Sequence, residues 1–226
     1  IFLELAENRN FINYRRFMRG GHLIDLDWLF RSYFDKESLD MEKAFSQQQP
    51  LYVCVTEVVT GDPVYIIADT RNYEELIKAS TALPLIYRGF PLLDGAEMTD
   101  GGVADSIPVR QAIKQGAKNI MVIRARHRGY MKKDTFGHRL IRWKMRQYPR
   151  LTRVMRERVH RHKQTVDLIR HPPAGVNVVE VCPPQSFSIG RFARDTDRLM
   201  QGYEEGRASA EQAIFAWQRL MNTHGK

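Results

Sequence analysis

The chain has 226 residues and a formal net charge of +9, with 43% hydrophobic and 27% charged residues. These ordinary globular values argue against a disordered chain or a coiled coil, and the lack of an apolar run of 18 residues excludes an ordinary membrane-spanning helix. The two cysteines, Cys54 and Cys182, lie far apart in apolar stretches. We interpret them as reduced, buried thiols of a cytoplasmic type of protein.

The first part of the chain is predicted to be helical. Apolar residues recur with helical spacing over 9–19 and over 25–34, where Asp25 is placed to act as an N-cap. A third short helix is expected over 40–48.

A β-hairpin is predicted next. Residues 51–59 are rich in β-branched side chains and residues 64–68 form a second such run. Between them lies the turn sequence Thr60-Gly61-Asp62-Pro63. A short helix is expected to follow over 73–80.

Glycine and proline are concentrated between residues 84 and 102, which indicates a long shaped loop of the kind that often carries function. Asp94-Gly95 within it favours a tight turn between two extended pieces. A helix is predicted over 107–115 and a strand over 119–125. Strand, loop, helix and strand in this order are typical of a layered α/β fold.

The last elements predicted are a strand over 176–182 and one or two helices over 191–219. Between the two final strands lies a segment of unusual charge. Residues 128–170 contain 14 lysines and arginines but only three acids, a net charge of +11, whereas the rest of the chain sums to −2. Two helices are predicted in this segment, over 133–147 and from Pro149 onward.

Three interpretations of the basic segment remain open. It forms a solvated helical pair that covers the core, it docks on anionic lipid headgroups, or it binds nucleic acid. Nucleic acid is the least favoured, because no zinc finger, RNA-recognition signature or homeodomain pattern is present. The candidate membrane-facing residues are Lys132, Lys133, Arg139, Arg142, Trp143, Arg146 and Arg150.

The sequence Asp100-Gly101-Gly102 is the strongest chemical signal. Two glycines after an aspartate let the backbone approach another element closely and turn into a helix. An aspartate on such a turn has few free torsions, as a carboxylate needs in order to orient or deprotonate a catalytic partner. Asp94 is the less favoured alternative carboxylate. Gly101 and Gly102 are expected to shape the backbone and carry no chemistry.

The order of several motifs resembles the C-terminal portion of bacterial patatin-like phospholipases. The motifs are strand 51–58 with Thr60-Gly61, the stretch Ala79-Ser80-Thr81-Ala82-Leu83-Pro84, Asp100-Gly101-Gly102 followed by Pro108, and strand 176–182 followed by Gly190-Arg191. The resemblance implies an α/β/α layered sandwich and a serine acyl hydrolase that uses a Ser–Asp dyad. Asp100 then corresponds to the base, and neither a metal nor an organic cofactor is implied.

One element of the family pattern is missing. The chain contains no Gly-x-Ser-x-Gly elbow, and its nearest approach, Ser186-Phe187-Ser188-Ile189-Gly190, follows the aspartate when the elbow should precede it. No glycine-rich oxyanion loop precedes residue 50, and the chain does not begin with Met. We therefore expect the nucleophile to lie upstream, in an absent N-terminal segment. The chain alone is expected to be inactive and to form a homo-oligomer or to pair with that segment.

Together these features predict one incomplete patatin-like domain over 1–226 with a basic helical insertion at 128–172. The predicted activity is hydrolysis of lipid acyl esters, of the phospholipase A or esterase type, by a cytoplasmic protein that associates peripherally with membranes. The alternative is a non-catalytic binding or scaffold module that uses the basic segment to bind nucleic acid or another acidic partner.

Overall fold

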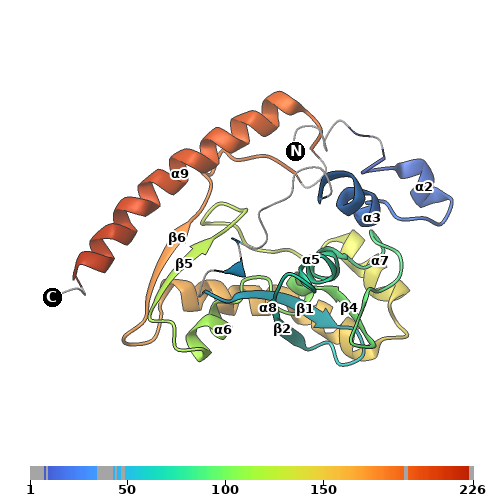
Figure 1. The fold of residues 1–226 in the computed structure, drawn as a ribbon, viewed down its shortest axis with the longest axis horizontal. Helices are drawn as coiled ribbons and strands as arrows, with labels where there is room; N and C mark the ends of the chain where they lie inside the picture. The colour runs from blue at the N-terminus through green and yellow to red at the C-terminus, as the bar shows by residue number, and fades with distance from the viewer. Residues whose placement is uncertain are drawn as a thin grey trace. The chain divides into compact units, whose positions relative to one another are not determined.

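The structure is a computed structural model that describes residues 8, 10–34, 43, 45–46, 49–190 and 193–223. The chain divides into two compact units. The first comprises 8–106 and 133–159, and the second comprises 107–132 and 160–226. Figure 1 labels most of the helices and strands from which the two units are built.

The first unit contains a four-stranded antiparallel sheet in the order β2-β1-β4-β3. Its strands are β1 (Leu51–Glu57), β2 (Pro63–Ala68), β3 (Leu92–Leu93) and β4 (Ala96–Asp100). The predicted hairpin is confirmed, because β1 and β2 are adjacent and antiparallel. The predicted Asp94-Gly95 turn is also confirmed and joins β3 to β4, with φ angles of 50° and 80° at its two residues.

Helix α5 (Tyr73–Thr81) packs on one face of this sheet, as the prediction of a helix over 73–80 implied. Its buried Leu76 and Ala79 contact Val53 and Val55 of β1 in a common apolar core. Because side chains alternate along a strand, Cys54 and Thr56 of β1 lie on the opposite face. The second face of β1 is therefore directed toward the turn after β4, where the candidate site is found.

The N-terminal helices are shorter than the sequence predicts. The helix expected over 9–19 is limited to α2 (Tyr14–Met18), because the side chain of Asn13 caps it by accepting a hydrogen bond from the Arg16 amide. The segment predicted as 25–34 divides into α3 (Leu26–Leu29) and a π-helical turn, η1 (Phe30–Phe34). The helix predicted over 40–48 lies largely outside the described residues.

Two helices form within the basic segment, α7 (Phe136–Lys144) and α8 (Pro149–Arg170), and α8 begins at the predicted proline. Leu151 of α8 is buried in the core of the first unit, and Ile169 of α8 is buried in that of the second. Both helices were expected within an insertion at 128–172. That insertion, like the single domain over 1–226, stays a prediction.

The second unit contains the parallel strand pair β5 (Asn119–Ile123) and β6 (Asn177–Val181). Val109 of helix α6 (Val109–Lys114) packs against Ile120 and Val122 of β5. A single long helix, α9 (Thr196–Thr223), occupies the segment in which one or two helices were expected.

The structure confirms a mixed α/β fold, with an antiparallel sheet in one unit and a parallel pair in the other. Within the described parts of the chain, every helix is too short or too polar to cross a membrane. Both cysteines are free thiols and are partly buried.

Candidate active site

Asp100 occupies the last position of β4 and is fixed through its backbone and its side chain. Its amide donates to the carbonyl oxygen of Ala82 at 3.1 Å, and its own carbonyl oxygen accepts from the Thr56 hydroxyl at 2.9 Å. Its Oδ1 accepts a hydrogen bond of 2.6 Å from the Gly102 amide, which caps the 3₁₀ turn η2 (Gly101–Val103). Asp100 is half-buried. The carboxylate is therefore held in one orientation at the end of the strand.

The turn has space only for glycine at position 101. A Cβ atom at Gly101 would lie 2.1 Å from the carbonyl oxygen of Cys54 and 2.6 Å from its carbonyl carbon. At Gly102 a Cβ atom would lie 2.9 Å from Oδ1 of Asp100. Distances below 3.0 Å to backbone atoms cannot be relieved by a side-chain rotation, so the turn packs directly against β1 because it lacks side chains there.

Two further residues face this turn from the sheet, and sequence reasoning did not identify either as part of the site. Cys54 and Tyr65 are cross-strand partners of β1 and β2, and therefore share one face. The Tyr65 hydroxyl donates to Oδ2 of Asp105 at 2.6 Å. The Cys54 sulfur lies 3.9 Å from the carbonyl oxygens of Gly101 and Asp105. The signal that could have placed Cys54 at the site is the alternation of side chains along β1, because assigning its apolar face puts Cys54 on the other face.

The environment of Cys54 makes its thiol a poor nucleophile. Burial, and then the negative charges of Asp105 and Asp100, raise its pKa to about 12. Burial and the hydrogen bond to Asp105 likewise raise the pKa of Tyr65 above its ordinary value. Both groups are protonated at neutral pH, and reactive cysteines require the thiolate. Neither side chain is therefore suited to act as a nucleophile at neutral pH.

The alternative residues are placed differently. Asp94 lies exposed in the β3–β4 turn. Ser188, the serine nearest to an elbow pattern, lies in the second unit, where its exposed hydroxyl accepts a hydrogen bond of 3.1 Å from Arg198. Across the described ranges, no three His, Cys, Asp or Glu side chains are grouped in a way that could hold a metal ion.

Helix α7 presents a row of exposed apolar side chains, which we call the α7 stripe. Phe136, Leu140 and Trp143 recur at helical spacing and have exposed fractions of 71%, 45% and 56%. The guanidinium of Arg139 lies 5.8 Å from the Phe136 ring, and Lys144 and Arg146 lie 5.4 and 5.3 Å from the Trp143 ring. The stripe is thus apolar along its centre and cationic along its borders.

The other predicted membrane-facing residues are not equivalent to one another. Arg142 forms two hydrogen bonds, of 2.7 and 2.8 Å, with the carboxylate of Asp134, so its charge is neutralised locally. Lys133 and Arg150 are exposed. Lys132 is half-buried and belongs to the second unit.

Two comparisons relate the chain to known sequences. A family model described as "Domain of unknown function (DUF6363)" matches residues 148–222. The chain is also 29% identical over 211 residues to the uncharacterized protein YjjU of Escherichia coli (strain K12). That match covers 92% of this chain and 59% of the relative, so the chain spans less than two thirds of its curated relative. Neither description states an activity.

Proposed function

We propose that the protein hydrolyses lipid acyl esters and that Asp100 is the general base of a Ser–Asp dyad. The serine is contributed by a segment outside the 226 residues. Asp100 accepts the hydroxyl proton as the serine attacks the ester carbonyl, and then returns it to the leaving alcohol. Water then attacks the acyl-enzyme, and Asp100 accepts its proton and transfers it to the departing serine oxygen, which releases the acid. Hydrogen-bond donors of the segment that carries the serine would stabilise the oxyanion.

The rigid placement of Asp100 is the observation that carries this proposal. Three hydrogen bonds fix its amide, its carbonyl oxygen and Oδ1, and the last of these holds the carboxylate on the same side as the turn. Hydrogen bonds that orient a base in this way reduce the reorganisation required during proton transfer.

The family resemblance supports the same assignment, and with it a patatin-like α/β/α sandwich. The mixed α/β elements and the strand, turn and helix order around Asp100 are compatible with that architecture. The remainder of such a sandwich would be supplied by further strands and helices outside this chain.

We further propose that the α7 stripe brings the enzyme to anionic membranes. Aromatic side chains favour the boundary between headgroups and acyl chains, and flanking Arg and Lys residues are attracted to anionic headgroups. The borders of the stripe are cationic at Arg139, Lys144 and Arg146, which favours an anionic bilayer over a neutral one.

The direct experiment replaces Asp100 in the full-length protein. Asp100→Asn keeps an oxygen that can accept the hydrogen bond from the Gly102 amide but removes the basic carboxylate. Hydrolysis of a short-chain p-nitrophenyl ester should fall by about 10²–10⁴-fold, the range expected when a general base is lost. Asp94→Asn is the matched control, because Asn also tolerates the positive φ of that position and turnover should be unchanged.

Circular dichroism and thermal unfolding separate a chemical effect from a folding defect in these variants. If Asp100→Asn folds and retains full turnover, Asp100 is not the base. If the full-length protein hydrolyses no ester at all, the hydrolase proposal is overturned.

A further inference from the structure

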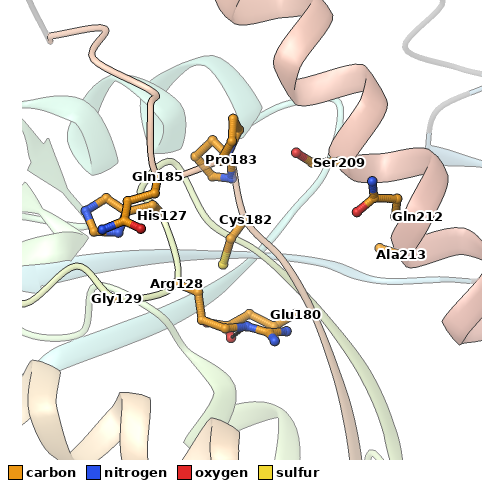
Figure 2. Close-up of a pocket in the computed structure, with 11 residues that line it drawn as sticks. His127, Arg128, Gly129, Glu180, Cys182, Pro183, Gln185, Ser209, Gln212 and Ala213 are labelled. Atoms are coloured by element: carbon orange, nitrogen blue, oxygen red, sulfur yellow. Dashed lines mark hydrogen bonds and ion pairs between the residues drawn. The ribbon is translucent and has the colours of Figure 1, made fainter.

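A cavity in the second unit is lined mainly by polar side chains. It has a volume of about 490 Å³, within the range of small-molecule sites. It lies beyond the carboxyl ends of β5 and β6, next to the loop after each strand and to α9 (Figure 2). Ligands of α/β proteins commonly bind at the carboxyl ends of parallel strands. The polar residues that line it include His127, Arg128, Glu180, Cys182, Gln185 and Gln212.

One carboxylate in this cavity faces two arginines. Glu180 accepts a hydrogen bond from Nη1 of Arg124 and another, of 3.1 Å, from Nε of Arg128. The side chains of Arg124 and Glu180 are only 3% and 5% exposed, so they form a buried pair that is neutral by itself. Glu180 is the only acid among the described residues that line the cavity. The charge of Arg128 is therefore not balanced by a second carboxylate.

The geometry of Arg128 leaves its outer edge available. Its side chain is 69% exposed, and the bond from Nε to Glu180 fixes the plane of the guanidinium. Neither Nη1 nor Nη2 forms a hydrogen bond with any part of the chain that the structure describes. This pair of nitrogens is one of the edges with which arginine binds two oxygens of a phosphate or carboxylate at once.

Donors also reach the cavity from its other sides. Figure 2 shows His127 and Gln185 on one side of Cys182, and Gln212 of α9 on the opposite side. The imidazole and the two carboxamides can each donate a hydrogen bond. Donors from three directions suit a group with three terminal oxygens better than a planar carboxylate with two.

We infer that this cavity binds the phosphate monoester group of a ligand, with the outer edge of Arg128 as its main contact. Glu180 orients that arginine, and His127 and Gln212 contact the remaining oxygens. The inference is independent of the chemistry at Asp100 and holds whether or not the protein is a hydrolase.

Isothermal titration calorimetry with glycerol 3-phosphate tests the site. We expect Arg128→Gln to raise the dissociation constant for glycerol 3-phosphate at least tenfold. Arg128→Lys should raise it less, because the charge is kept but the two-pronged geometry is lost. The control is Arg126→Gln, at an exposed arginine near the Tyr130 ring that does not line the cavity, and its affinity should equal that of the wild type. No measurable binding by the wild type, or equal binding by Arg128→Gln, would overturn the inference.

The same variants identify the source of the phosphate group. If it is a lipid headgroup, Arg128→Gln but not Arg126→Gln will reduce co-sedimentation with phosphatidic acid vesicles, and glycerol 3-phosphate will compete. If the ligand is soluble, both variants will co-sediment equally with the vesicles, and only Arg128→Gln will lose its affinity for glycerol 3-phosphate. Far-ultraviolet circular dichroism of Arg128→Gln should match the wild type, because its side chain is mostly exposed.

Discussion

Tyr65 and Asp105 are joined by a hydrogen bond of 2.6 Å between the tyrosine hydroxyl and Oδ2 of the carboxylate. This bond links β2 to the end of the turn that begins at Asp100. The opposite end of the turn is held by the hydrogen bond between Thr56 and the carbonyl oxygen of Asp100. The turn is thus attached to two neighbouring strands, and the Tyr65 hydroxyl supplies an attachment to β2.

Removing that hydroxyl should destabilise the fold. Tyr65→Phe leaves Asp105 without this donor, and we expect the free energy of unfolding to fall by about 1.5–3 kcal/mol, as for hydrogen bonds to charged groups. Urea unfolding measures the change. The control is Tyr203→Phe, at an exposed tyrosine of α9, which should unfold like the wild type. Equal stability of Tyr65→Phe and the wild type would show that the bond does not hold the turn.

Gly101→Ala should be among the more damaging single substitutions in the first unit. The added methyl group would come within 2.1 Å of the Cys54 carbonyl oxygen, so β1 or the turn must move. We expect a loss of about 3 kcal/mol or more, at the upper end of single-residue effects. In Gly206→Ala the new methyl group meets no atom within 4 Å, and the substitution should stabilise helix α9 by about 0.5–1 kcal/mol. Thermal unfolding of the two variants should therefore shift in opposite directions.

The local elements were predictable because their signals lie in neighbouring residues. β-Branched residues around a Thr-Gly-Asp-Pro turn predict the β1–β2 hairpin, and Pro149 marks the first residue of α8. The helix predicted over 9–19 is too long, since the apolar spacing starts before Asn13 but the side chain of Asn13 caps the N-terminus, so the helix begins only at Tyr14. Spacing alone does not reveal at which polar residue a helix begins.

The contacts that build the two sites could not be predicted in the same way. Tyr65 and Asp105 are 40 residues apart, and Arg124 and Glu180 are 56 apart. Such pairs depend on which strands become neighbours, which is decided by tertiary packing. Asp100 was identifiable from the sequence only because two glycines follow it directly. No residue next to Glu180 in the sequence indicates that two arginines contact its carboxylate.

The raised pKa of Cys54 predicts a loss of stability at alkaline pH. An unfolded thiol ionises near its ordinary value of 9.0, but the folded protein keeps the proton until about pH 12. Between these values the unfolded state binds fewer protons, so the free energy of unfolding falls as the pH rises. Urea unfolding at pH 8 and pH 10.5 should show a smaller decrease for Cys54→Ala than for the wild type. Equal decreases would contradict the assigned environment.

The α7 stripe predicts selective binding to anionic vesicles. Replacing both Phe136 and Trp143 by alanine should weaken co-sedimentation with phosphatidylglycerol-containing vesicles about tenfold or more, because each aromatic ring buries apolar area at the interface. The matched control is Phe215→Ala on α9, where a phenylalanine is equally exposed at 68%. Binding of the wild type should fall in high salt. Equal binding to neutral vesicles would count against the docking surface.

The role of Asp100 can be measured most directly by the reaction of the full-length protein with a fluorophosphonate, which labels activated serines covalently. Mass spectrometry should find one labelled serine, outside residues 1–226. The labelling rate should fall by about a hundredfold or more in Asp100→Asn and remain unchanged in Asp94→Asn. Labelling at the wild-type rate in a folded Asp100→Asn variant, or no labelled serine in the wild type, would contradict a base at position 100.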